Sequence, residues 1–297
     1  MSMMLAIPPP IEPGTLLTRW SWTPFALLGS GAAAIWYVGA TRRVARAGLP
    51  VSPRRTAAFL SGVAVLVIAL ASPIDTYADV SFTVHMVQHL LLSFVAPPLL
   101  ALGAPIALAL RASAPRTRSR LRTWLRGRTA RALANPVVGF VAFATLPFVV
   151  HFSPLFDLAL RNTWVHAGEH LLLLAVGAIY WWPLVGADPI PHRPGHGVRV
   201  LSMLLMLPAQ SFVALAITAA SAPLYPTYAA LPAPFGPNAL ADQRAAAAVM
   251  WVIGAILTIS FALAAAAAWR RAEESAVRRV ETARPRMPSG VRGNGSG

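Results

Sequence analysis

Seven stretches of the chain consist mainly of apolar residues and are separated by shorter segments rich in arginine or proline. Each stretch is close to the roughly 20 residues that an α-helix needs to cross a bilayer. They lie at about residues 23–41, 56–72, 81–109, 135–152, 163–185, 200–222 and 244–269. The pattern predicts an all-α fold, a polytopic membrane helix bundle with seven transmembrane helices.

The third stretch is too long for one straight crossing and contains Pro97-Pro98. Proline removes a backbone donor and disfavours helix at the preceding residue, so we expect a kink there. From Glu273 onward the chain is rich in Arg, Pro, Gly and Ser, with few apolar residues. We therefore expect a transmembrane domain at residues 1–270 and a basic, disordered cytoplasmic tail at residues 271–297.

Composition supports the membrane class and narrows the chemistry. Hydrophobic residues make up 56% of the chain, charged residues only 12%, and the mean hydropathy is +0.59. No soluble domain of this size is so apolar. All 25 basic residues are arginine, which, with the abundant Ala, Gly and Pro, suggests a high-GC bacterial genome and a bacterial cell membrane. Without cysteine there is no disulfide, thiolate metal site or covalent c-type haem.

The distribution of arginine predicts the orientation of the bundle. Of the 25 arginines, 22 lie after the first, third and fifth stretches or beyond the last one. Cytoplasmic loops carry such an excess, so we expect the N-terminus outside and the C-terminus in the cytoplasm. These arginines face the anionic inner leaflet, which explains the net charge of +15 without nucleic acid. Residues 1–14 lack a basic region before an apolar core, so we expect no signal peptide.

Two histidine pairs, His85/His89 and His166/His170, lie within the third and fifth stretches. Residues four apart share one face of a helix, about one turn from each other, so both rings of a pair can reach one ion. Ionisable side chains are scarce in membrane helices and must find a partner. Each pair therefore has the spacing of a chelate.

Further polar residues are expected at the same, extracytoplasmic depth. The predicted metal ligands are His85, His89, His166, His170, His151, Met86 and Glu169, with Asp75, Asp79 and Asp242 as accessory residues. Simpler roles stay open for each. A membrane histidine can be only an interhelical hydrogen-bond partner, Met86 can be packing, and Asp242 can cap the last helix.

A third pair, His192/His196, repeats the spacing in a segment on the cytoplasmic side. Prolines surround it, so we expect no helix to align these rings and no metal role. Imidazole suits copper, zinc, iron and nickel, and histidine with a nearby thioether favours copper. Zinc and haem remain alternatives. Haem needs one ligand from each of two facing helices, whereas neighbours on one helix are better placed to share a small ion.

Several collinear motifs resemble the CtaG-type (caa3-type) family of bacterial cytochrome c oxidase assembly factors. They run from about Leu60 to Trp251 and comprise Ser72-Pro73-Ile74-Asp75-Thr76-Tyr77, His85-Met86-Val87-Gln88-His89, Ala96-Pro97-Pro98, His151-Phe152-Ser153-Pro154, Tyr180-Trp181-Trp182-Pro183, Ala222-Pro223-Leu224-Tyr225-Pro226 and Asp242-Gln243-Arg244. Ala246-Ala247 departs from a glycine pair that is frequent in the family. The resemblance implies a role in oxidase assembly at the copper centres, with oxidase subunits as partners. An unrelated single-span, cysteine-bearing copper chaperone shares the family's name and is not similar to this chain.

Two other functions compete with copper delivery. One is a redox protein that binds haem or quinone at the same depth. The other is a copper permease, for which Gln210, Met203 and Met206 are the only inward polar or thioether candidates. No Ser-His-Asp set, glycine-rich phosphate loop or hydrolytic carboxylate pair is recognisable, so we expect no enzymatic activity.

Overall fold

The computed structural model describes residues 8–283 except 11, 13 and 192. Within these residues the regular structure is entirely helical, which confirms the all-α prediction. The helices are α1 (Thr15–Thr18), α2 (Pro24–Arg46), α3 (Pro53–Ala71), α4 (Pro73–Ala78), α5 (Phe82–Leu90), the π-helix η1 (Leu91–Val95), α6 (Ala96–Leu102), α7 (Pro105–Ala112), α8 (Pro115–Arg126), α9 (Arg128–Leu133), α10 (Pro136–His151), α11 (Leu155–Arg161), α12 (Thr163–Val185), α13 (His196–Ala219), α14 (Pro226–Ala229), the 3₁₀ helix η2 (Gly236–Asn238) and α15 (Ala239–Ala283).

Six of the described helices are long and apolar enough to cross a membrane, and a bent pair makes a seventh. The bent pair is α10 and α11, whose axes differ by 66°. Helix α10 has 16 residues, so it rises about 24 Å, which is less than the 30 Å of a bilayer core. The fourth predicted span is therefore a broken one, whereas the other six are long helices.

One predicted boundary differs from the structure at the C-terminal end. Helix α15 continues past residue 270 to Ala283, so the first part of the predicted tail is helical. Ion pairs one turn apart, from Arg270 and Arg278 to Glu274, accompany this extension. The remainder of the tail, residues 284–297, and most of the segment before residue 14 lie outside the described residues.

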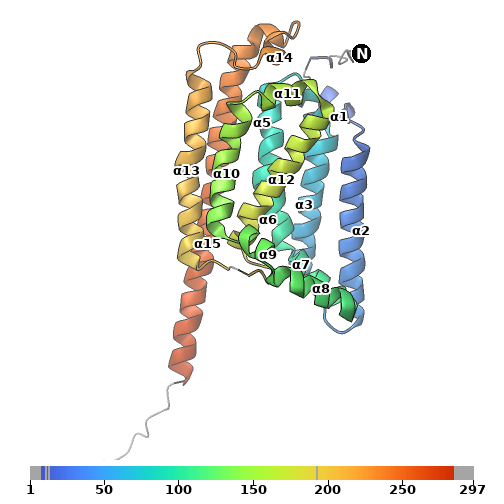
Figure 1. Cartoon of the computed structure of the whole chain (residues 1–297), viewed down its shortest axis with the longest axis vertical. Helices are drawn as coiled ribbons and strands as arrows, with labels where there is room; N and C mark the ends of the chain where they lie inside the picture. Colours follow the sequence, from blue (N-terminus) through green and yellow to red (C-terminus); the bar gives the residue numbers. More distant parts are fainter. Residues whose placement is uncertain (1–7, 11, 13, 192, 284–297) are drawn as a thin grey trace, which may run out of the picture.

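The helices run side by side, with α11 and α14 at one end of the bundle and α8 and α9 at the other (Figure 1). We name these the α14 end and the α8 end. The continuous segment α5–η1–α6 packs against α3, α12 and α15 and so forms the centre. Helix α2 lies at the edge, where it packs on α3 and α7.

The central segment changes its winding at η1, where the amide of Ala96 bonds to the carbonyl of Leu91, five residues back. The Pro97-Pro98 pair explains this change. In an α-helix the carbonyl of Ser93 would accept from residue 97, and in a π-helix from residue 98, and neither proline has an N–H. The indole N–H of Trp181 donates to this carbonyl instead, at 2.9 Å. A contact between helices thus replaces the missing backbone bond.

Two aspartates from elsewhere in the chain cap the ends of the third span. Asp242, in the first turn of α15, accepts from the backbone amides of Phe82 and Thr83, at 2.6 and 3.2 Å. Asp188, just beyond α12, accepts from the backbone amides of residues 106 and 107 in α7 and from the indole of Trp182. A carboxylate at a helix N-terminus accepts hydrogen bonds from the free amides there and interacts favourably with the positive end of the helix dipole.

Candidate metal centre

The two histidines of α5 are fully buried or nearly so and face each other. The Nε2 atoms of His85 and His89 lie 2.8 Å apart, so one ring donates its N–H to the other. The exposed fractions of the residues are 0% and 7%. Their helix, α5, is fixed by the Asp242 cap and by packing against α4 and α15. The two rings therefore meet on one face of α5, as their spacing predicts.

Helix α12 brings its histidines and Glu169 to the same place. The rings of His166 and His170 are 4.2 Å apart, and those of His85 and His166 are 5.1 Å apart, between centroids. Glu169 Oε1 lies 3.7 Å from His89 Nε2. One ligand atom from each of His85, His89 and Glu169 lies within 4.8 Å of the other two. We call His85, His89, His166, Glu169 and His170 the His/Glu cluster.

Several polar atoms of the cluster are buried and have no hydrogen-bond partner among the described residues. They are both carboxylate oxygens of Glu169, Nε2 of His166 and Nε2 of His170. Buried polar atoms in native proteins are almost always paired, and an unpaired carboxylate is especially costly. Imidazole nitrogen and carboxylate oxygen are metal ligands. The donor set and its unmet bonding capacity therefore fit a metal ion.

The three predicted accessory aspartates have different surroundings. Asp79 Oδ1 lies 3.9 Å from Nδ1 of His166, and burial, together with the charge of Asp75, raises the pKa of Asp79 to about 6. Asp75 accepts from Ser21 and Gln88, at 2.7 and 3.0 Å, and burial raises its pKa despite these bonds. Asp75 therefore joins three segments of the chain, and among the three aspartates only Asp79 contacts a cluster histidine.

The accessory role predicted for Asp242 is not what its contacts show. Its carboxylate accepts from the amides and hydroxyls at the start of α5. The capping alternative for Asp242 concerns the helix that carries it, α15. The helix that Asp242 caps is α5. Through this bond α15 holds the helix on which His85 and His89 lie.

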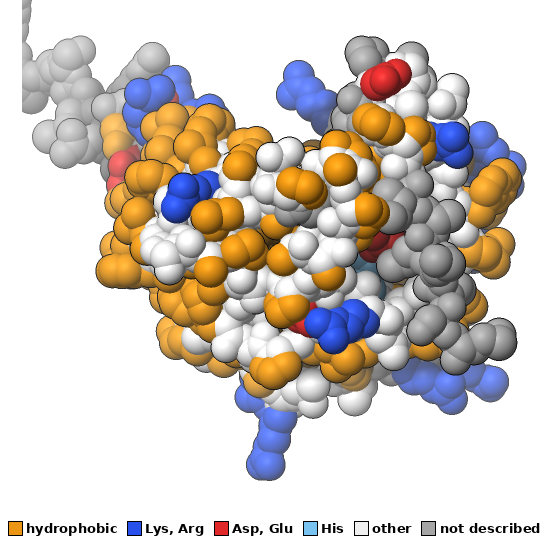
Figure 2. Space-filling model, turned by 90° about the horizontal axis from the view of Figure 1, so that it is seen from above, with side chains coloured by type: hydrophobic (Ala, Val, Ile, Leu, Met, Phe, Trp, Pro, Cys, Tyr) orange, Lys and Arg blue, Asp and Glu red, His pale blue; other side chains and the backbone are white. Residues whose placement is uncertain are grey.

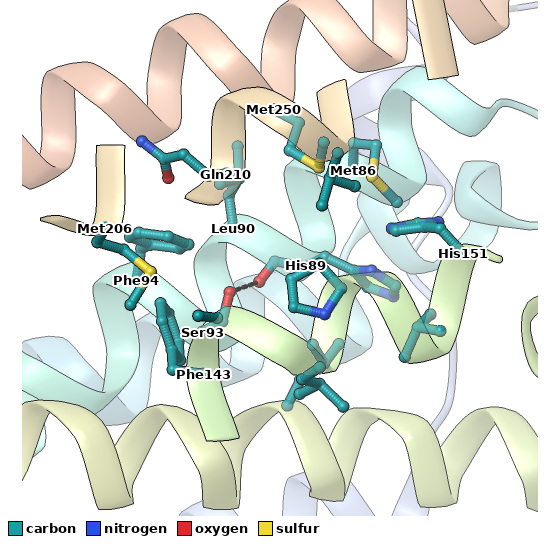
Figure 3. Close-up of a pocket in the computed structure, with 16 residues that line it drawn as sticks. Met86, His89, Leu90, Ser93, Phe94, Phe143, His151, Met206, Gln210 and Met250 are labelled. Atoms are coloured by element: carbon teal, nitrogen blue, oxygen red, sulfur yellow. Dashed lines mark hydrogen bonds between the residues drawn. The ribbon is translucent and has the colours of Figure 1, made fainter. Parts of the chain in front are cut away.

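Met86 and His151 belong to a neighbouring cavity more than to the cluster. Met86 follows His85 by one residue, a rotation of about 100°, so it leaves the face shared by His85 and His89. It lines a cavity together with His151, and His89 forms part of the wall (Figure 3). The centroids of the His151 and His89 rings are 6.3 Å apart. The predicted single ligand set is thus divided between two places.

Two tyrosines that sequence reasoning missed contact these histidines. The hydroxyl of Tyr228 lies 3.2 Å from Nδ1 of His85 and donates to the carbonyl of Ala78. The hydroxyl of Tyr225 lies 3.0 Å from Nδ1 of His151. Both come from the connection between α13 and α15. The signal was their position in a segment predicted at the same depth as the histidine pairs.

Of the third histidine pair, His196 is described, and it lies outside the His/Glu cluster. His196 is the first residue of α13, so the expectation that no helix would include it is wrong for this residue. The preceding prolines do not prevent this helix, because they lie before its first residue. His192 lies outside the described residues.

The cluster lies below the surface at the α14 end. The side chains of His166 and Asp79 are 13% and 33% exposed, whereas that of Glu169 is fully buried. Figure 2 looks onto this end and shows a histidine and acidic side chains among apolar and uncharged groups. The solvent-accessible edge of the cluster is therefore its His166/Asp79 side.

Membrane-length helices around a buried His/Glu cluster define a multi-pass membrane protein with a candidate metal centre. The chain belongs to the cytochrome c oxidase caa3 assembly factor family (Caa3_CtaG), whose match covers residues 35–272. The resemblance noted from the motifs is thereby confirmed, and a bacterial membrane location agrees with it.

Curated relatives come from mycobacteria. An uncharacterized protein of Mycobacterium leprae is 34% identical over 261 residues, which are 84% of this chain and 40% of the relative. Uncharacterized proteins of Mycobacterium bovis and Mycobacterium tuberculosis are each 29% identical over 283 residues, which are 93% of this chain and 43% of each relative. The chain therefore spans about two fifths of the length of these relatives. No solved structure matches the chain.

Proposed function

We propose that this assembly factor binds copper in the His/Glu cluster and delivers it to a subunit of cytochrome c oxidase. The family supplies the assembly role. The copper cargo is our inference from the donor set, and the protein acts as a carrier with no catalysis of its own. The cluster lies on the extracytoplasmic side if the arginine-rich loops are cytoplasmic.

The observation that carries this proposal is the unpaired carboxylate of Glu169 among four imidazoles. A cluster built only for packing would satisfy its buried polar atoms within the protein, as the caps of α5 and α7 do. An ion bound by His85, His89 and Glu169 would use these atoms. The side chain of His166, 13% exposed, lies at the solvent-accessible edge of the cluster.

The geometry favours a small ion over haem or quinone. The cluster rings contact one another at centroid distances of 4.2–5.1 Å and do not face each other across a flat slot. The adjoining cavity has a volume of about 60 Å³, which holds a few water molecules. A macrocycle or quinone ring is much larger than this space.

The permease alternative receives partial support from two of its three candidate residues. Met206 and Gln210 line the adjoining cavity, whereas Met203, one turn earlier on α13, does not. Among the described residues, no chain of polar side chains continues from Gln210 to the α8 end in this cavity. Delivery from the α14 end therefore remains the function that the arrangement supports best.

Metal analysis of the purified protein tests the proposal. Wild-type protein loaded with Cu(II) and desalted should retain it, and His85→Ala/His166→Ala should lose it while remaining folded. His196→Ala is the matched control, because it removes an imidazole at the α8 end and should leave copper content unchanged. Copper-free wild-type protein, or full retention by the double variant, would contradict the proposal.

The orientation is tested separately with topology reporters. A reporter fused after Arg271 should be cytoplasmic, and one inserted within residues 223–241 should be outside. The opposite result would place the cluster on the cytoplasmic side and remove delivery to an external copper centre.

A further inference from the structure

A small cavity adjoins the His/Glu cluster within the membrane-spanning part of the bundle. Residues of α5, α10, α12, α13 and α15 line it, and its volume is about 60 Å³. His89 belongs both to the cluster and to the cavity wall (Figure 3). The cavity therefore adjoins the cluster at His89, and His166, Glu169 and His170 do not line it.

Methionine is concentrated around this cavity. The described residues contain four methionines, Met86, Met203, Met206 and Met250, and all except Met203 line it. The three come from three helices, α5, α13 and α15, which are far apart in sequence. In Figure 3, Met86 and Met250 lie at the His151 end of the cavity, and Met206 and Gln210 lie at the other end.

His151 is held in a defined orientation at this end. The hydroxyl of Tyr225 lies 3.0 Å from its Nδ1 atom and fixes the ring. A hydrogen bond to one imidazole nitrogen is the usual way in which a protein orients the other nitrogen toward a metal. His151 is 6% exposed, so the residue as a whole is buried.

We propose that Met86, Met250 and His151 form a second metal site, specific for a soft monovalent ion, Cu(I), which adjoins the His/Glu cluster through His89. This inference deepens the proposed function and takes the identity of the cargo from it. Met86 and His151 then act here, and not as ligands of the cluster.

The ligand chemistry separates the two sites. Thioether sulfur is a soft ligand that favours Cu(I), and imidazole also binds copper. The three donors carry no charge, and most of the cavity wall is apolar. These surroundings would offset little of the free energy needed to desolvate a divalent ion. The cluster offers a carboxylate and more imidazoles, which suit a divalent ion. Each site thus favours a different form of the same metal.

Copper(I) and silver(I) test the second site, silver being a redox-inert soft probe. Whole protein is loaded without oxygen, and X-ray absorption then identifies the ligand atoms. The wild type should show sulfur ligands to the ion, and Met86→Leu/Met250→Leu should lose them. Met-to-Leu changes conserve volume, so the double variant is expected to fold.

Met203→Leu is the matched control. Met203 is on the same helix as Met206 and is 3% exposed, but it does not line the cavity. This variant should keep the sulfur ligands, and Met86→Leu/Met250→Leu should keep Cu(II) binding by the cluster. A wild-type ion with only nitrogen and oxygen ligands, or sulfur ligands that survive in the double variant, would overturn the second site.

The outcomes of this experiment and of the copper-content test are independent. Sulfur ligands in a wild type that binds no Cu(II) would defeat the proposed function and leave the second site standing. Cu(II) binding that depends on His85 and His166, without sulfur ligands to Cu(I), would support the proposed function and defeat the second site.

Discussion

Glu169 and Asp188 are both buried carboxylates at opposite ends of α12, and their surroundings differ. Asp188 accepts from two backbone amides of α7 and from the indole of Trp182, at 2.7–3.3 Å. Within the part of the chain that the structure describes, Glu169 has no hydrogen-bond partner on either oxygen. A satisfied carboxylate joins elements of the fold, whereas an unsatisfied one keeps its bonding capacity for a ligand. This contrast between the two carboxylates is what the proposed function predicts.

Asp242→Ala should have the largest effect on stability among the carboxylate variants. It leaves the amides of Phe82 and Thr83 without an acceptor and releases the helix that carries His85 and His89. We expect a loss of about 2–4 kcal/mol of unfolding free energy, together with weaker copper retention. Thermal unfolding and metal content of the same preparation measure both. Unchanged stability would show that the cap is dispensable.

Asp188→Ala should lower stability without changing copper binding. It removes the acceptor at the start of α7, and we expect a loss of about 1–3 kcal/mol. The control is Glu274→Ala on the exposed part of α15, whose ion pairs should contribute less than about 0.5 kcal/mol. Copper content per folded molecule should match the wild type. A selective loss of copper in Asp188→Ala would break the contrast between the two ends.

Glu169→Gln should have the smallest effect on stability and a clear effect on metal. The amide has the same shape, and no protein donor to the carboxylate is lost. Thermal stability of the metal-free protein should stay within about 0.5 kcal/mol, because the change breaks no internal bond. Copper affinity, measured by chelator competition, should fall at least tenfold, by about 1.4 kcal/mol. A destabilisation as large as that of Asp188→Ala would instead make Glu169 a structural residue.

Much of the fold follows from the hydropathy pattern, because membrane helices are set by length and apolarity. Six of the predicted stretches correspond to long helices. The fourth does not stand alone, because a break after His151 bends the chain into α11. The end of α15 was also misplaced, because polar residues with ion pairs one turn apart extend a helix beyond the membrane.

The histidine pairs of the site could be predicted because their spacing is local. Contacts between distant segments could not. Tyr225 and Tyr228 reach the histidines from a connection, and Asp242 caps a helix other than its own. The displacement of Met86 from the cluster was within reach of the sequence, since adjacent residues of a helix never share a face.

The π-helical turn at Leu91–Val95 sets the angle between the two halves of the central segment. A helix advances about 100° with each residue, so one residue more or fewer in this turn would rotate His85 and His89 by that angle relative to α6. The two histidines would keep their identity, but both side chains would point in another direction. The direction in which His85 and His89 point therefore depends on the number of residues in this turn more than on their identity.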